Sequence, residues 1–271
     1  MHLENTYRDP QIHDSWRRVY HSNKAQSRFD DKIYDWLFRT LQPNGSWLDA
    51  GCGPGEHSVR IARSTGAGIL AIDISPAALK LASETVQSQR LGAQISLERC
   101  ALEDLPPSVK VDHVHSRGVL MHIPEWRSAL GNLCDCIRND GYLVLFENNC
   151  LSLEMLVVKA IRFFRHFRSQ MVNSDGGIEF WSEEGGNPFV VRAASIKALV
   201  SVMQSHGIEL VARRTASLFD IFRFPPIMRP AVIALNRIWF RWNLPFGSGV
   251  ILVGRRSSAA HHGDSSDPTG H

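Results

Sequence analysis

The sequence predicts an α/β protein built on a doubly wound, mostly parallel sheet of seven strands. From residue 46 onward, short apolar runs alternate with amphipathic stretches that have helical spacing. The apolar runs are nearly continuous, which is typical of strands covered by helices on both faces. A chain of 271 residues, 44% of them hydrophobic and 21% charged, can bury such a core without disulfides.

The first five strands are expected between residues 46 and 148. Strands are predicted at 46–51, 68–74, 94–99, 111–116 and 140–148, with helices at 55–65, 75–92 and 124–138. Ser75 and Pro76 support the start of the second helix, because serine is a favoured N-cap and proline fits the first helical position. Strands that are joined through helices in this way run parallel to one another.

The alternation breaks after residue 148. One long helix is expected at 151–173, followed by a loop at 174–189 that is rich in glycine and glutamate. A helix at 193–206 and strands at 208–215 and 249–256 complete the sheet. We therefore expect a helical lid at 1–45, a main domain at 46–256 with a cap inserted at about 151–192 and a second apolar segment at 221–244, and a disordered tail at 257–271.

The composition argues against several classes of protein. The formal net charge of +3 is only mildly basic and does not indicate a nucleic-acid partner. The five cysteines are scattered without a CxxC pair, which favours reduced thiols in the cytoplasm, and no metal-ligand spacing stands out. The polar N-terminus lacks the apolar core of a signal peptide, and no apolar run reaches the length of about 18 residues that a spanning helix needs.

Three glycines follow the first predicted strand. Gly51, Gly53 and Gly55 remove side chains where the strand passes into a helix, so a ligand can lie against the backbone, although tight packing of the turn is an alternative. The dinucleotide pattern G-x-G-x-x-G fails because Glu56 occupies its sixth position, and this argues against an NAD-linked oxidoreductase. No Gly-Lys-Ser/Thr follows, so a P-loop is also excluded.

Two acidic residues accompany the glycines. Asp73 ends the second strand, where a carboxylate is well placed to accept both hydroxyls of a ribose, unless it is a solvated loop residue. Asp49 precedes the first glycine, where it either accepts from a cationic group of the ligand or orients the loop. Together these features predict a nucleoside ligand at the carboxyl end of the sheet.

The motifs "LDAGCGPG", "AIDIS", "CALEDLP" and "VDHVHSRGVLMHIPE" occur in this order along the chain. They resemble class I S-adenosylmethionine-dependent methyltransferases, and most of all the small-molecule branch that includes quinone and sterol methylases. The resemblance covers residues 40 to 150 well and the closing elements more loosely. It implies a Rossmann-like fold and S-adenosyl-L-methionine as the cofactor.

The resemblance also implies roles for individual residues. The three glycines would lie against the methionine part of the cofactor, with Asp49 near its amino group and Asp73 on the ribose hydroxyls. The other cofactor contacts that it implies are Ile74 packed on the adenine, Ala101 and Leu102 at the adenine edge, Ser116 through its carbonyl near the sulfonium, and Tyr20 in the lid. Ala101 departs from the family, which often has an aspartate there, and Tyr20 alternatively packs the lid to the sheet.

His122 is the candidate catalytic residue. Methyl transfer from a sulfonium mainly requires alignment of the acceptor and exclusion of water, and a base is needed only when the acceptor loses a proton. A histidine can take that proton at neutral pH, and His122 follows the fourth strand on the ligand side. The alternative is a capping or packing role for this side chain.

The acceptor site is expected between the two irregular stretches. Both combine arginines with apolar residues, among them Phe163, Phe164 and Trp239. They either wall an apolar acceptor pocket, lie on a membrane surface, or form a cap helix whose arginines reach into water. We therefore expect O-methylation of a bulky or amphiphilic small molecule, such as a quinone precursor, polyketide or lipid-linked sugar. The alternative is a non-catalytic scaffold protein of the same fold.

Overall fold

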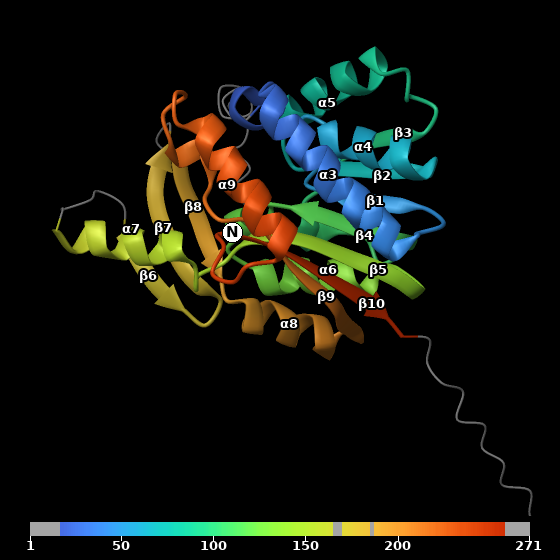
Figure 1. The fold of residues 1–271 in the computed structure, drawn as a ribbon. Helices are drawn as coiled ribbons and strands as arrows, with labels where there is room; N and C mark the ends of the chain where they lie inside the picture. The colour runs from blue at the N-terminus through green and yellow to red at the C-terminus, as the bar shows by residue number, and fades with distance from the viewer. Residues whose placement is uncertain (1–16, 165–169, 185–186, 258–271) are drawn as a thin grey trace, which may run out of the picture.

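The computed structural model describes residues 17–164, 170–184 and 187–257, and its centre is a sheet of seven strands (Figure 1). The strand order is β3-β2-β1-β4-β5-β10-β9. The strands are β1 (Trp47–Ala50), β2 (Ile69–Asp73), β3 (Ile95–Arg99), β4 (Val111–Arg117), β5 (Ile137–Asn148), β9 (Ile208–Ser217) and β10 (Gly249–Arg256). The first five are parallel, and β10 runs antiparallel to both β5 and β9. The predicted fold class is confirmed.

Helices cover both faces of this sheet. The helices α3 (Lys24–Leu41), α4 (Glu56–Thr65), α5 (Pro76–Ser88) and α9 (Arg229–Trp242) pack on one face, and α6 (Trp126–Asp135) and α8 (Ile196–Ser205) pack on the other. The central strands β1, β4 and β10 therefore bury both of their faces, which explains their continuous apolar runs, whereas the edge strands β3 and β9 are largely exposed. Short turns of helix, η1 (Arg17–His21), η2 (Leu102–Asp104), η3 (Leu120–His122) and η4 (Ile221–Arg223), border the sheet.

The segment after β5 differs from the expectation of one long helix and a loop. Helix α7 (Leu153–Phe164) is shorter, and β6 (Gln170–Ser174), β7 (Gly177–Glu184) and β8 (Asn187–Ala194) form an antiparallel three-stranded sheet. Asp175 and Gly176 are the two residues of the tight turn between β6 and β7. Asp-Gly is a strong hairpin signal, and the strands on either side contain aromatic and β-branched residues. The sequence-based prediction was wrong here because it weighted the glycines as loop residues.

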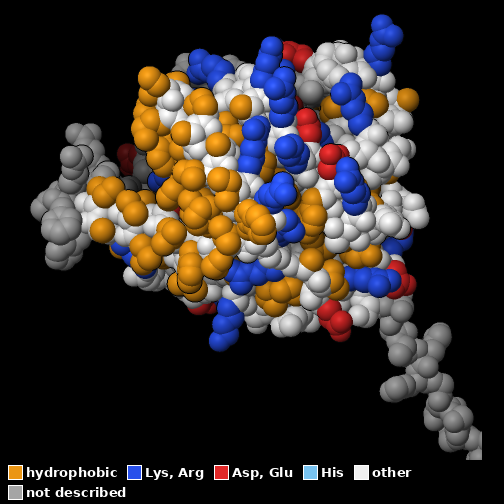
Figure 2. All heavy atoms as spheres, in the orientation of Figure 1, with side chains coloured by type: hydrophobic (Ala, Val, Ile, Leu, Met, Phe, Trp, Pro, Cys, Tyr) orange, Lys and Arg blue, Asp and Glu red, His pale blue; other side chains and the backbone are white. Residues whose placement is uncertain are grey.

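Helix α7 and the small sheet project from one side of the molecule, and α9 lies beside α3 across the main sheet (Figure 1). Apolar side chains gather on the outer surface of α7 and α9 (Figure 2). The predicted lid is represented by η1 and α3, while residues 1–16 and 258–271, including most of the predicted tail, lie outside the described residues.

A buried chain of hydrogen bonds connects four elements beneath the glycine loop. The carboxylate of Asp49 on β1 accepts from the Ser58 hydroxyl of α4 and from Nδ1 of His115 on β4, the latter at 2.8 Å. The Nε2 atom of His115 is 2.8 Å from the hydroxyl of Tyr34 on α3. All four side chains are buried. Since buried polar groups are costly without partners, the chain fixes α3 and α4 against β1 and β4.

Replacing Asp49 with alanine is expected to lower the free energy of unfolding by about 3 kcal/mol or more, because it leaves the His115 and Ser58 donors buried without their acceptor. Tyr34→Phe removes a single hydrogen bond at the end of the chain and should cost about 1 kcal/mol. Urea unfolding at constant m-value measures both variants. If both variants lowered the free energy of unfolding by the same small amount, a structural role for Asp49 would be contradicted.

Candidate active site

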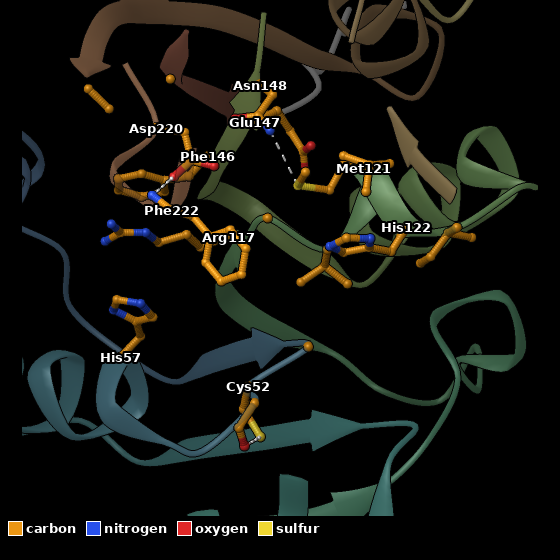
Figure 3. Close-up of a pocket in the computed structure, with 18 of the residues that line it drawn as sticks. Cys52, His57, Arg117, Met121, His122, Phe146, Glu147, Asn148, Asp220 and Phe222 are labelled. Carbon is orange, nitrogen blue, oxygen red and sulfur yellow. Dashed lines mark hydrogen bonds between the residues drawn. The ribbon is translucent and has the colours of Figure 1, made fainter. Parts of the chain in front are cut away.

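A cavity of about 550 Å³ lies at the carboxyl end of the sheet, between the glycine loop and the segment that joins β9 to α9. Figure 3 shows Cys52 and His57 on one side of it and Phe146, Glu147, Asp220 and Phe222 on the opposite side. The strand order reverses between β1 and β4, so the loops that follow these strands diverge and leave a crevice. The cavity therefore lies where an open parallel sheet usually binds its ligand.

The three glycines have different surroundings. A Cβ atom on Gly51 would come within 2.3 Å of Val119, and one on Gly55 would press on Ala82 of α5. Gly53, with φ of +52°, lines the cavity and has nothing within 4 Å of such an atom. Gly51 also lines the cavity, whereas Gly55 does not. Gly53 is thus the position where the bare backbone borders open space in the cavity, whereas a side chain at Gly51 or Gly55 would meet neighbouring residues.

Asp73 lies beside this bare loop. Its two carboxylate oxygens accept from the amides of Gly53 at 2.9 Å and Ser75 at 2.8 Å. Each oxygen has a second lone pair that can accept a further donor. Ile74, Ala101 and Leu102 line the same end of the cavity. The structure therefore brings together most of the residues that the motifs assign to a nucleoside.

Other predicted residues lie elsewhere. Asp49 and Ser116 do not line the cavity, and the carboxylate of Asp49 is taken up by His115 and Ser58 rather than facing a ligand amino group. The side chain of Tyr20 lies outside the described residues. Sequence motifs locate the strand ends correctly, but they do not indicate which side chains turn inward beneath the loop.

His122 lines the opposite end of the cavity, beside β8. Its Nδ1 lies 2.9 Å from the carbonyl oxygen of Val190, which can only accept, so this nitrogen carries the proton and Nε2 is the basic one. The ring also packs against Phe189 with centroids 5.3 Å apart. Burial lowers the pKa of His122 to about 4, and the imidazole is therefore neutral at pH 7.

Glu147 is a site residue that the sequence reasoning missed. It lies at the end of β5, where Oε1 accepts from the amide of Leu120 at 3.2 Å. Within the described part of the chain, Oε2 is buried without a hydrogen bond of ordinary geometry. Burial raises the pKa of Glu147 to about 8, although Arg192 acts against this shift. The sequence signal that could have identified Glu147 is a carboxylate at the end of an apolar run, the same signal that identified Asp73.

One of the two described arginines that line the cavity, Arg223, belongs to the predicted apolar segment 221–244, and the other, Arg117, comes from the main sheet. Arg117, at the end of β4, lines the cavity and is held by Asp30 at 2.8 Å and by the ring of Phe146, 5.0 Å from its centroid. Arg223 of η4 lines it as well. Trp239 does not line the cavity, and the side chains of Phe163 and Phe164 lie outside the described residues.

The apolar wall comes instead from β8 and from the segment before α9. It is formed by Phe189, Val191, Phe219, Ile221 and Phe222. The predicted cap therefore contributes to the cavity through strand β8, of which only the first three residues were expected to belong to a loop. Within the described residues, no group of three or more histidine, cysteine, aspartate or glutamate side chains is arranged to hold a metal ion.

Comparison with known proteins places these features in a family. Residues 41–175 match the family described as a methyltransferase domain. The tRNA U34 carboxymethyltransferase of Tolumonas auensis is 40% identical over 119 residues, which are 41% of this chain and 36% of that protein. The methyltransferase GfsG of Streptomyces halstedii is 24% identical over 125 residues, 46% of this chain and 44% of that protein. The chain thus spans less than half the length of these relatives.

Solved structures share the fold over nearly the whole chain. Magnesium protoporphyrin IX methyltransferase from Synechocystis PCC 6803, with bound S-adenosylhomocysteine, superposes with a TM-score of 0.64 at 18% identity and covers 94% of this chain and 98% of its own. A methyltransferase from Methanosarcina mazei gives 0.60 at 19% identity and covers 83% and 98%. Residues 41–175 therefore form a methyltransferase domain, and the chain has the fold of class I S-adenosylmethionine-dependent methyltransferases, which supports S-adenosylmethionine as its cofactor.

Proposed function

We propose that the protein methylates an oxygen atom of a bulky or amphiphilic small molecule that binds at the apolar end of the cavity. The observation that carries this proposal is the continuity of the cavity, which runs from the bare backbone at Gly53 to the apolar wall of β8 and η4. A continuous cavity allows donor and acceptor to meet without water, and alignment of the two is the main requirement of methyl transfer.

The residues at the glycine end fit S-adenosylmethionine. Gly51 and Gly53 leave room along the backbone, Asp73 offers carboxylate lone pairs to the ribose hydroxyls, and Ile74 with Ala101 and Leu102 would flank the adenine. The bound cofactor supplies a methyl group that is activated by the positive charge on sulfur. The protein's own contribution is then to hold the acceptor and to remove its proton.

Two side chains at the acceptor end can receive that proton. We assign general base catalysis to Glu147, because a pKa of about 8 matches the operating pH of most enzymes far better than the value of about 4 for His122. We assign to His122, the candidate base from the sequence, a positioning role for the acceptor, since its ring lines the cavity and is held by the Val190 carbonyl and by Phe189. Arg117, whose charge is balanced by Asp30, adds a hydrogen-bond donor for a polar substituent on the acceptor.

A nucleic-acid acceptor is the second candidate. It is favoured by the similarity to tRNA U34 carboxymethyltransferases. Incubation with methyl-labelled S-adenosylmethionine, followed by separation of total tRNA from solvent-extractable metabolites of the host, distinguishes the two. Label in the extractable fraction supports the small-molecule acceptor, and label confined to tRNA overturns it.

Gly53→Val is expected to abolish binding of S-adenosylhomocysteine, since the branched side chain would fill the space left for the ligand. Gly66→Val is the matched control. Gly66 has φ of +70° and equally open surroundings, but it caps the far end of α4. Both variants carry a similar backbone strain of about 1–2 kcal/mol. Calorimetric titration should show wild-type affinity for S-adenosylhomocysteine in the Gly66 variant and none in the Gly53 variant. Wild-type affinity in both variants would mean that the glycines serve only the packing of the loop.

Asp73→Ala is expected to weaken S-adenosylhomocysteine binding at least tenfold, because a charged acceptor contributes about 1.5–3 kcal/mol per hydrogen bond. Asp35→Ala removes an exposed carboxylate of α3 that does not line the cavity, and it serves as the control. Urea unfolding checks that the loss of the Gly53 and Ser75 hydrogen bonds leaves the fold intact. An unchanged dissociation constant for the Asp73 variant would refute the ribose assignment.

The pH dependence of kcat distinguishes Glu147 from His122 as the base. A base acts in its deprotonated form, so with Glu147 the rate should rise with pH and level off above about 8. With His122 the rate would already be level above about 4. Glu147→Gln should lower kcat about 100-fold or more and remove the rise, with S-adenosylhomocysteine affinity changed only a few-fold. A rise that persists in this variant would exclude Glu147.

A further inference from the structure

Helices α7 and α9 expose a large apolar surface on one side of the molecule. Figure 2 shows apolar side chains gathered there over both helices. Trp242 is 68% exposed, Leu156 62% and Ile227 88%. We call this surface the apolar face, and its described members are Leu151, Leu153, Leu156, Val157, Ile161, Phe222, Ile227, Met228, Leu235, Ile238, Trp242 and Phe246. Single exposed apolar residues are ordinary, but a contiguous group of this size marks an interaction surface.

Contacts between the segments make the face continuous. The amide of Leu153, at the start of α7, donates to the carbonyl of Phe246 after α9 at 3.0 Å. Glu154 of α7 pairs with Arg223 of η4 and accepts from the amide of Asp220 at 2.7 Å. The start of α7, η4 and the loop after α9 are therefore fixed against one another, and the exposed side chains of all three belong to one surface.

The charges around this face are mainly positive. Residues 221–246 contain four arginines and no acidic residue, although Asp220 directly precedes this range. Arg223 is paired with Glu154, so Arg229, Arg237 and Arg241 are the cations that this segment adds. Lys159 and Arg162 add two cations on α7, whose single carboxylate, Glu154, is buried against Arg223. An apolar surface flanked by cations complements the acyl region and the anionic headgroups of a bilayer.

A second copy of the chain fits this face less well. A two-fold dimer would bring each face against itself and place the arginines of α9 near those of its partner. Like charges at an interface oppose association. No helix within the described residues is long and apolar enough to cross a bilayer. Contact of α7 and α9 with the membrane surface agrees with the positive charge of this face and requires no spanning helix.

The apolar face also reaches the cavity. Phe222 and Arg223 of η4 line the cavity and are exposed on the surface. A molecule dissolved in the outer part of a bilayer would thus meet the cavity entrance without crossing water. We propose that the apolar face docks on an anionic lipid bilayer and that, if the proposed function holds, the acceptor is a membrane-dissolved amphiphile that enters beside Phe222.

The test measures binding of the purified full chain to sedimented vesicles, without cofactor or acceptor, so its result does not depend on the proposed function. One set of vesicles contains equal parts of phosphatidylcholine and phosphatidylglycerol, and the other contains phosphatidylcholine alone. Stronger binding to the anionic vesicles that weakens with added salt is expected. Leu156→Glu with Trp242→Glu should lower that binding about tenfold or more, and Arg229→Glu with Arg241→Glu should do the same for the anionic vesicles alone.

Matched controls come from the rest of the surface. Val211 is 51% exposed at the end of β9 that is remote from the cavity, and Lys80 is exposed on α5 at the opposite edge of the sheet. Val211→Glu and Lys80→Glu should leave vesicle binding unchanged. All variants must retain the wild-type affinity for S-adenosylhomocysteine, which shows that they are folded. Absence of vesicle binding by the wild type, or a stable dimer in which Trp242 is protected from quenchers, would overturn the proposal.

Discussion

The pairing of β1 with β4 is the constraint on which the rest of the structure depends. The sheet extends from β1 toward β3 on one side and from β4 toward β9 on the other, so the cavity opens above this pair. The bond between Asp49 and His115 joins the two strands directly, and Ser58 and Tyr34 connect α4 and α3 to them. The protein tolerates this buried carboxylate because both of its oxygens have partners. The fixed strand ends then position Gly53 and the acceptor end opposite each other.

Burial also sets the chemistry of the end of the cavity that contains Glu147 and His122, where we propose that the acceptor binds. It raises the pKa of Glu147 and lowers the pKa of His122, because the loss of water favours the uncharged form of both groups. Near pH 7 this end therefore presents a mostly protonated carboxyl group and a neutral imidazole. The charge of Arg117 is offset by Asp30. Such surroundings suit an apolar molecule with one ionisable hydroxyl better than a polyanion.

The sequence predicts the parallel part of the fold and the glycine end of the site because both are local signals. Continuous apolar runs mark buried strands, and Gly53 and Asp73 directly follow or end such runs. What the sequence leaves open has a tertiary origin. Whether Asp49 faces a ligand or orients the loop depends on His115, which lies on a strand 66 residues away. Glu147, to which we assign the role of base, was missed because its raised pKa comes from burial, which the sequence does not show, and a histidine was the natural candidate near neutral pH. The hairpin at Asp175 and Gly176 carried a local signal that was given too little weight.

Helix α9 carries apolar side chains both on the side that packs on the sheet and on its outer side. Its inner residues Val232, Ile233 and Phe240 pack in the main core, as an amphipathic helix on the surface of a globular protein requires. Its outer residues Leu235, Ile238 and Trp242 are apolar too, and in such a helix this side is ordinarily polar. Arg229, Arg237 and Arg241 belong to the same helix, so α9 combines apolar and cationic side chains in the way that is typical of helices at a membrane interface. The core and α3 cover one side of α9, and the composition of the other side agrees with the proposed contact with a bilayer.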